Sequence, residues 1–321
     1  MIKKILVTGG GGYIGTNLVK HLLEKKYHVK VIDTFWFGKY LKKNKNLTII
    51  KKDIRNIKYS DIGNVDCIIH LASIANDPAG DLDPSLTWDV NVLATYKIIN
   101  LALKQKVKKF IFASSGSVYG IKKEKKVTEE LSLEPVSEYN KSKMIAERIL
   151  LSYKKNIDLI ILRPATVCGY SPSMRLDVAV NALTFNALKN KKIKVFGGKQ
   201  IRPNLHMSDM IEAYEFFINQ NLKKNRRNDQ IIYNVGFDNL SIINIAKTVK
   251  KTVNLKSEIF IKPSNDPRSY RQNSDRLIKL GFKKRKIIND AIKEIEEKFN
   301  NNKIKKNKKY FRINTLKVIN K

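Results

Sequence analysis

A cluster of glycines near the N-terminus restricts the possible folds of this chain more than any other feature. Residues 8–15 read TGGGGYIG and directly follow the apolar run Ile5–Val7. A buried strand that leads through a glycine-rich turn into a helix can hold a pyrophosphate, because the start of the helix offers unpaired N–H groups and a partial positive charge. Here Gly9 would permit the tight turn, Gly12 the close approach of the backbone to the phosphates, and Gly15 the packing of helix against strand. The pattern predicts a dinucleotide-binding βαβ unit.

The second predicted strand, at residues 28–33, ends in the carboxylate of Asp33. A carboxylate at this position accepts hydrogen bonds from a ribose diol and repels a 2′-phosphate. No basic residue adjoins Asp33, so the sequence favours NAD over NADP. A glycine-rich loop without a ligand is the alternative, but it does not explain why strand, helix and acid occur together at this spacing.

Short apolar strands alternate with helices through the first half of the chain. Strands are predicted at residues 4–9, 28–33, 47–52, 67–72, 109–115, 158–164 and 194–196, and helices at 13–25, 85–106, 137–155 and 176–190. This alternation is typical of an α/β protein with a Rossmann-type, doubly wound parallel sheet.

The 321 residues divide into two predicted domains and a tail. We assign the NAD-binding domain to residues 1–165 and a smaller, mixed α/β substrate domain to residues 166–300. Segments near 203–220 and 231–236 could return to the first domain. Residues 301–321 are rich in Lys and Asn and are expected to form a loose basic tail on the surface.

The composition is strongly basic, with 63 Lys and Arg against 29 Asp and Glu and a formal net charge of +34. The basic residues are spread along the whole chain and not gathered in one stripe. This distribution indicates that they cover the solvent-exposed faces of the protein, and we expect no nucleic-acid partner. The same field would attract a polyanionic substrate.

Neither a membrane anchor nor a metal site is expected. No apolar run reaches the length that spans a bilayer, and the N-terminus lacks the long apolar stretch of a signal peptide. The two cysteines, Cys67 and Cys168, fit a reduced, cytoplasmic protein. The histidines and cysteines show no spacing typical of metal ligands.

Two segments carry the residue types of proton and hydride transfer. The predicted strand 109–115 ends in the run SSGSVYG, and YNKSK opens a later predicted helix, in which Tyr139 and Lys143 share one face. A nearby ammonium and a nicotinamide cation both favour the phenolate, and lowering a tyrosine pKa from about 10 to near 7 is worth roughly 4 kcal/mol. Such a phenolate can take a proton from a sugar hydroxyl while hydride leaves the same carbon. A serine at the strand end can hydrogen-bond that hydroxyl.

Further motifs accompany these two segments. They are Asp53-Ile54-Arg55, His70-Leu71-Ala72, Asn91, Leu162-Arg163-Pro164, Arg202 with His206 and Asp209, and Tyr233-Asn234-Val235-Gly236. Together they make the sequence, to about residue 295, resemble the extended short-chain dehydrogenase/reductase family in its NAD-dependent sugar epimerase/dehydratase branch. Within that branch it is similar to enzymes of the UDP-glucose 4-epimerase type.

This resemblance implies roles for individual residues. Ser115, Tyr139 and Lys143 would form the catalytic triad, and Asp53 and Ile54 would flank the adenine. The implied cofactor-binding residues are Gly9, Gly12, Tyr13, Ile14, Gly15, Asp33, Asp53, Ile54, Leu71, Ala72, Ser73, Asn91, Tyr139, Lys143 and Pro164. The residues implied to bind a nucleotide-diphosphate sugar are Ser115, Ser117, Thr166, Arg175, Arg202 and Arg268. The family also implies a homodimer joined through the predicted helices 85–106 and 137–155.

Arginine is scarce in this lysine-rich chain, so its positions are informative. Arg202 and Arg268 lie where members of the family hold the nucleotide phosphates, and a planar guanidinium matches phosphate oxygens bidentately. Arg175 is a weaker candidate for the same role. The acidic loop 76–84 follows the fourth predicted strand, where it could contact the sugar or only turn the chain.

The resemblance also narrows the reaction. Sugar 4,6-dehydratases of the family carry acids directly before the Val-Tyr-Gly motif, where this chain has Gly116 and Ser117. Two reactions of the family remain as alternatives. One is epimerisation, expected at C4 through a 4-keto sugar, and the other is reduction of a 4-keto sugar nucleotide. Asp33 favours the epimerase, because an epimerase recycles its own NAD whereas reductases often use NADPH. A non-catalytic NAD-binding regulator is a third alternative, which the intact serine, tyrosine and lysine disfavour.

The sugar itself stays open. UDP-glucose 4-epimerases have Tyr-Phe-Asn after the arginine of the sixth strand, where this chain has Pro164-Ala165-Thr166. The substrate could therefore differ from UDP-glucose. The biological role expected for such an enzyme is the assembly of cell-surface polysaccharides.

Overall fold

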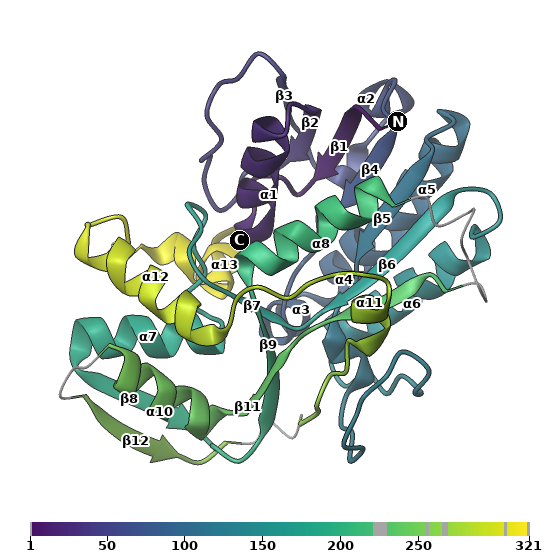
Figure 1. The fold of residues 1–321 in the computed structure, drawn as a ribbon. Coiled ribbons are helices and arrows are strands. Elements are labelled where there is room, and N and C mark those ends of the chain that lie inside the picture. The colour runs from purple at the N-terminus through teal and green to yellow at the C-terminus, as the bar shows by residue number, and fades with distance from the viewer. Residues whose placement is uncertain (1, 221–229, 254–256, 265–268, 305–306, 320–321) are drawn as a thin grey trace.

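The computed structural model describes residues 2–220, 230–253, 257–264, 269–304 and 307–319. Its centre is a seven-stranded sheet in the order β10-β6-β5-β4-β1-β2-β3, with every neighbouring pair parallel (Figure 1). The strands are β1 Lys4–Thr8, β2 His28–Asp33, β3 Leu47–Lys51, β4 Cys67–His70, β5 Lys109–Ala113, β6 Asp158–Pro164 and β10 Ile232–Val235. The predicted doubly wound parallel sheet is confirmed.

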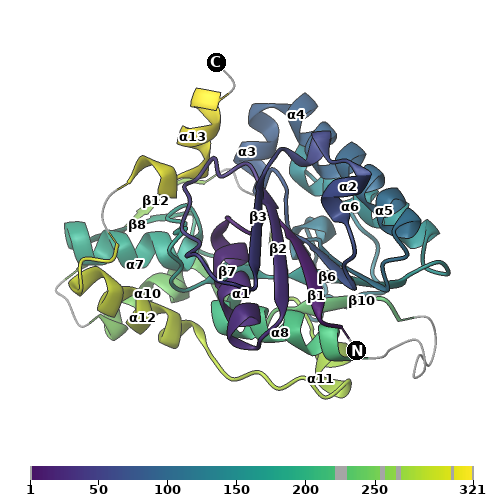
Figure 2. The same cartoon turned by 90° about the horizontal axis from the view of Figure 1, so that it is seen from above.

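Helices cover both faces of this sheet (Figure 2). On one face lie α1 (Tyr13–Glu24) and α8 (Met207–Asn219), and on the other α5 (Ala94–Lys104) and α6 (Glu138–Ser152). Because both faces are covered, the strands are almost continuous apolar runs, which is why they stand out in the sequence.

Shorter helical segments shape the edge of the sheet. They are a 3₁₀ turn Ile54–Asn56, α2 Tyr59–Ile62, α3 Asp77–Leu82, α4 Pro84–Trp88, a π-helical turn Asp89–Leu93, a 3₁₀ turn Gly116–Tyr119 and α11 Asp275–Lys279. The helix predicted at 85–106 therefore consists of α4, the π-helical turn and α5 in succession. Of the helices in the described ranges, none is long and apolar enough to cross a membrane.

The order of the strands reverses beside β1. From β1 the chain proceeds outward to β2 and β3, and it then returns to place β4, β5 and β6 on the opposite side. The loops that follow β1 and β4 therefore diverge at the carboxyl edge of the sheet, and such a switch point is where doubly wound sheets bind their ligands.

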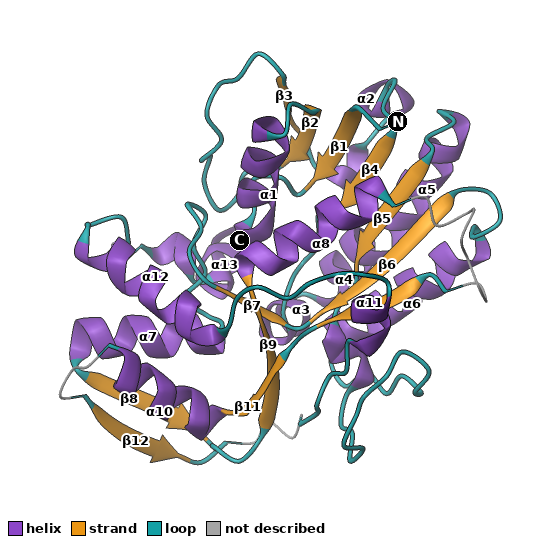
Figure 3. Cartoon of the chain, in the orientation of Figure 1, coloured by secondary structure: helices purple, strands orange, loops and turns teal. Residues whose placement is uncertain are grey.

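The second half of the chain builds a smaller unit of mixed sheet and helix (Figure 3). One sheet has the order β11-β9-β7, with β9 parallel to β7 and antiparallel to β11, and β8 pairs in parallel with β12. The strands are β7 Thr166–Cys168, β8 Lys192–Phe196, β9 Ile201–His206, β11 Asp238–Ser241 and β12 Glu258–Lys262. The helices α7 Ala179–Asn190, α10 Ile242–Thr252 and α12 Ile288–Asn300 share a separate apolar core.

The lysine-rich C-terminal segment is not the loose tail that its composition predicts. It forms a 3₁₀ turn at Lys308–Tyr310 and helix α13 at Arg312–Ile319, which packs against α3. Tyr310 and Leu316 are buried in the apolar layers on the two faces of the central sheet. The burial of these apolar side chains holds the segment against the protein, while Lys308, Lys309 and Lys317 stay exposed.

Candidate active site

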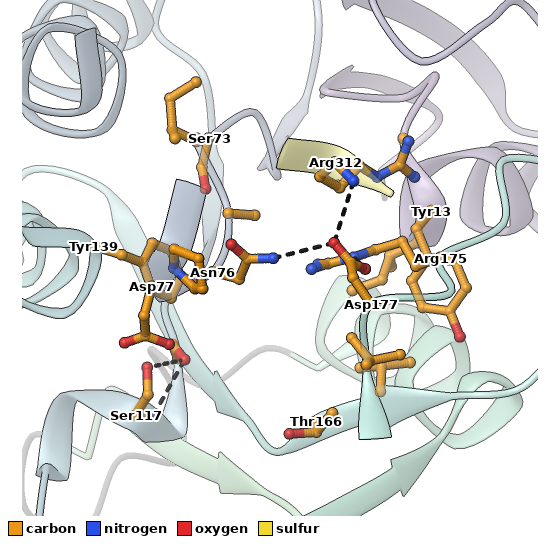
Figure 4. A pocket seen from close by; sticks show the side chains of 18 of the residues that line it. Tyr13, Ser73, Asn76, Asp77, Ser117, Tyr139, Thr166, Arg175, Asp177 and Arg312 are labelled. Carbon is orange, nitrogen blue, oxygen red and sulfur yellow. Dashed lines mark hydrogen bonds and ion pairs between the residues drawn. The ribbon is translucent and has the colours of Figure 1, made fainter. Parts of the chain in front are cut away.

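A cavity of about 810 Å³ opens at the carboxyl edge of the central sheet and extends to β8 and β9 of the smaller unit. Most of the residues predicted to bind cofactor or substrate line it (Figure 4). They are Gly9, Gly12, Tyr13, Ile14, Gly15, Asp33, Asp53, Ile54, Leu71, Ala72, Ser73, Ser115, Ser117, Tyr139, Lys143, Pro164, Thr166, Arg175 and Arg202. Arg268 lies outside the described residues.

The glycine-rich turn leaves no room for side chains at two positions. Gly9 has φ +74°, and a Cβ there would lie 2.6 Å from the backbone nitrogen of Ala72. A Cβ on Gly15 would lie 2.2 Å from the carbonyl oxygen of Gly9. No side chain caps α1, which begins after Gly12, so the amides of its first turn stay available to an anion. The turn therefore fits the diphosphate of a dinucleotide.

Asp33 lines the cavity beside the glycine-rich turn. Its carboxylate accepts hydrogen bonds from the backbone N–H groups of Gly11 at 2.9 Å and Phe35 at 2.5 Å. Burial raises the pKa of Asp33, and these two N–H groups act in the opposite direction. The carboxylate thus fixes the glycine-rich turn as well as lining the cavity.

Asn91 does not line the cavity, although it was expected to bind cofactor. Its buried amide accepts from the N–H of Ile74 at 2.8 Å, and it donates to the carbonyl of Ile74 at 3.1 Å and to Ser142 Oγ at 2.9 Å. These bonds use both ends of the amide, so Asn91 holds the loop after β4 against α6 from behind the cavity wall.

Tyr139 and Lys143 enter the cavity from the first turns of α6. Lys143 is 2% exposed, and its Nζ donates to the carbonyl of Ala113 at 2.8 Å. Burial lowers the pKa of Lys143 to about 7. Burial also raises the pKa of Tyr139 to about 12, with a hydrogen bond to Ser115 lowering it and Asp77 raising it. Among the protein groups around Tyr139, burial outweighs the hydrogen bond and the nearby charges and holds the pKa of Tyr139 above its ordinary value.

A chain of hydrogen bonds leads from Ser115 to a carboxylate. Ser115 Oγ lies 2.7 Å from Ser117 Oγ. Ser117 Oγ in turn lies 2.5 Å from Asn140 Oδ1. At the other end of the same amide, Asn140 Nδ2 lies 2.9 Å from Asp77 Oδ1. The NH₂ of Asn140 donates to Asp77, so the oxygen of the same amide faces Ser117 and accepts from its hydroxyl.

This polarity fixes the hydroxyl hydrogens along the chain. Ser117 donates to Asn140, so the Ser117 oxygen accepts from Ser115. With its hydrogen directed to Ser117, Ser115 has lone pairs to offer to a ligand hydroxyl in the cavity. Asn76 and Asp77 of the acidic loop 76–84, for which the sequence allows either a contact with the sugar or a simple turn, line the cavity.

Arg175 lines the same cavity in an ion pair with Asp177, with Nε 2.9 Å from Oδ1. Burial lowers the pKa of Arg175, but Asp177 more than offsets this and leaves the pKa raised. Its buried Nη2 has no hydrogen-bond partner in the described part of the chain. Asp177 also accepts from Asn76 Nδ2 at 3.2 Å and from the backbone N–H of Arg312 at 3.3 Å (Figure 4). Arg175 therefore has donor capacity left for a ligand.

Several cavity residues have no signal in the sequence. Asn76, Asp77, Asp177 and Arg312 come from segments far apart in the chain, without a fixed spacing that identifies them. Asn140 adjoins Tyr139 in the sequence and donates to Asp77, but it does not itself line the cavity. Only the position of loop 76–84 after β4 pointed toward the site. Within the described ranges, no group of three or more His, Cys, Asp or Glu residues is placed to hold a metal ion.

Comparisons with known proteins agree with this geometry. The model of the NAD dependent epimerase/dehydratase family matches residues 5–236. YtcB of Bacillus subtilis (strain 168), an uncharacterized UDP-glucose epimerase, is 32% identical over 286 residues, covering 82% of this chain and 88% of that protein. The UDP-glucose 4-epimerase of Lactobacillus helveticus is 28% identical over 271 residues, covering 77% and 81%.

Solved structures give the same result. UDP-glucuronic acid 4-epimerase from Bacillus cereus, in complex with UDP-glucuronic acid and NAD, matches with a TM-score of 0.80 at 26% identity, covering 92% of this chain and 99% of that one. The family match includes the glycine-rich turn, Ser115, Tyr139 and Lys143, and the cradle at Gly9 and Gly15 fits NAD, the cofactor of the family. This chain is a member of the NAD dependent epimerase/dehydratase family.

Proposed function

We propose that the protein is a nucleotide-sugar epimerase that inverts C4 through a 4-keto sugar. The observation that carries the proposal is that one cavity joins the dinucleotide cradle, the pair Tyr139 and Lys143, and the arginines Arg175 and Arg202. The relatives named as UDP-sugar 4-epimerases support the same substrate class.

Bound NAD, held by the glycine-rich turn and Asp33, would supply the acceptor and donor of the C4 hydride in the proposed reaction. Tyr139 removes the proton of the C4 hydroxyl and later restores it. Lys143 stabilises the phenolate through its charge. Ser115 accepts a hydrogen bond from the hydroxyl and so orients it, because its own hydrogen is held by Ser117.

An elimination is disfavoured at the position where related dehydratases carry acids. Gly116 and Ser117 have no carboxylate, and a Cβ on Gly116 would lie 2.9 Å from Gln272 Oε1. An acid at residue 116 would therefore require Gln272 to move. Arg202, on β9, is proposed to bind the diphosphate of the sugar nucleotide, and Arg268 is proposed to do the same from outside the described ranges.

The first test is to denature the purified protein and identify any dinucleotide that it releases. Stoichiometric NAD, mostly oxidised, supports a self-recycling epimerase, and nucleotide sugars would then be screened for inversion at C4. An empty site that takes up NADPH would instead point to a 4-keto-sugar reductase.

The substitution Tyr139→Phe tests the mechanism directly. We expect turnover to fall by about 10³-fold, since the general base is lost, while the amount of bound NAD stays unchanged. Full activity of this variant would contradict the role of Tyr139. Bound NAD with no activity on any nucleotide sugar, in the unmodified protein, would favour a non-catalytic regulator.

A further inference from the structure

The C-terminal segment is anchored on the wall of the cavity. The carbonyl of Tyr310 accepts from the N–H of Leu176 at 2.9 Å, and the N–H of Arg312 donates to the carboxylate of Asp177 at 3.3 Å. Asp177 is the partner of Arg175, so the first residue of α13 helps to hold that arginine in place. The segment is thus tied to the site at two successive points.

The Arg312 side chain binds α13 to the rest of the protein. It is 4% exposed, and its guanidinium lies 4.0 Å from the centre of the Phe37 ring in the loop after β2. Its Nη2 donates to the carbonyl of Ser173 at 2.9 Å and contacts Ser173 Oγ at 3.3 Å. Burial and the charge of Arg175 lower the pKa of Arg312 to about 9. A buried cation whose side chain is held by neutral acceptors would be stabilised by an anion.

The inner face of α13 also forms part of the cavity. Arg312, Ile313 and Leu316 line it together with Trp36 and Phe37, at the end where β2 terminates. The charge of Arg312 also acts on Asp33, the residue expected to bind the ribose. The adenosine half of a bound dinucleotide would therefore lie under α13.

We propose that α13 is a clasp of the dinucleotide site, closed by Arg312, and that it limits the exchange of NAD. The clasp encloses the adenosine half between α13 and the loop after β2, and the charge of Arg312 acts on Asp33 at this end of the cavity. The family match ends at residue 236, so the clasp is a feature of this chain beyond the matched region. NAD held in this way would stay bound between successive turnovers.

The test measures dinucleotide release without any sugar, so its outcome does not depend on the proposed epimerase activity. Protein loaded with NADH is mixed with excess NAD, and the fall in bound NADH fluorescence gives the dissociation rate. We expect Arg312→Ala to raise this rate about tenfold or more, because it removes the ring contact and the hydrogen bonds to Ser173. The NADH dissociation rate of Arg312→Lys should lie between those of the unsubstituted protein and Arg312→Ala.

Controls separate a clasp from a general loss of stability. Lys317→Ala removes a charge from the exposed side of the same helix and should leave the rate unchanged. Phe37→Leu removes the ring while keeping an apolar side chain, and it should accelerate release in the same way as Arg312→Ala. If Arg312→Ala and Phe37→Leu both keep native circular dichroism and release NADH at the original rate, the proposal is wrong.

Discussion

At the scale of single residues, Lys143 is a lysine held almost entirely out of water, with 2% of its surface exposed. Its pKa is lowered to about 7 in the folded protein, by burial, from an ordinary value of 10.5. Below about pH 7 the Lys143 ammonium is protonated in both the folded and the unfolded chain, so burying its charge lowers the free energy of unfolding by the full amount. Above pH 7 the folded protein releases the proton while the unfolded chain keeps it, so stability rises with pH.

The titration of Lys143 predicts that the free energy of unfolding depends on pH, and that the substitution Lys143→Met removes this dependence. For the NAD-free protein we expect the free energy of unfolding to rise between about pH 7 and 9, with a slope from this group approaching 1.4 kcal/mol per pH unit. Urea unfolding of both proteins across this range measures the difference. Parallel curves for the two proteins would show that Lys143 does not titrate in this window.

Ser117 is the second residue whose role can be isolated. Ser117→Ala breaks the chain to Asn140 and frees the hydrogen of Ser115, which can then turn toward the cavity. We expect kcat to fall about tenfold with little change in KM, the effect of losing one orienting hydrogen bond.

Ser117→Thr is the matched control, since it keeps the hydroxyl and should retain most of the activity. If Ser117→Ala instead changed only KM, Ser117 would bind substrate and would not orient Ser115. Asp77→Asn tests the far end of the chain, because an amide can also donate and no longer fixes the orientation of Asn140.

At the scale of elements, the glycine-rich turn allows fold and cofactor binding to be separated. We expect Gly15→Ala to destabilise the protein and abolish NAD binding, because its Cβ would meet the Gly9 carbonyl at 2.2 Å. Gly12→Ala should keep the fold, since its Cβ has only one close contact, at 3.3 Å, but it should weaken NAD binding by crowding the phosphates. Thermal unfolding and bound dinucleotide per chain distinguish the two variants. Equal NAD content in Gly12→Ala and the original protein would contradict this reading of the turn.

The elements that the sequence predicts well are those with a local signal. The parallel strands are apolar runs, and the turn at Gly9 and the pair Tyr139 and Lys143 depend on short, fixed spacings. Helix α13 has no such signal, because its burial depends on contacts with Phe37 and Asp177, which lie far away in the chain. The same holds for Asp77 and Asn140, which meet only because α3 packs on α6.

At the scale of the whole molecule, two large apolar side chains are exposed on the stretch that runs from α4 through the π-helical turn into α5. Leu93 is 59% exposed and Tyr96 is 50% exposed, and a spacing of three residues places them on one helical face beside α6. Exposed apolar side chains that lie together on one face are typical of a contact that is buried in an assembly.

We therefore propose a homodimer through α5 and α6, and we expect Leu93→Asp combined with Tyr96→Asp to produce monomers. Burying two carboxylates at the centre of a symmetric contact is strongly unfavourable, and the symmetry doubles the cost. Light scattering with size-exclusion chromatography measures the mass of both forms. Ile278→Asp, at a side chain 43% exposed on α11, is the matched control and should leave the mass unchanged. A monomeric mass for the unsubstituted protein would refute the interface, whereas a dimer that survives both substitutions would place the contact on another face.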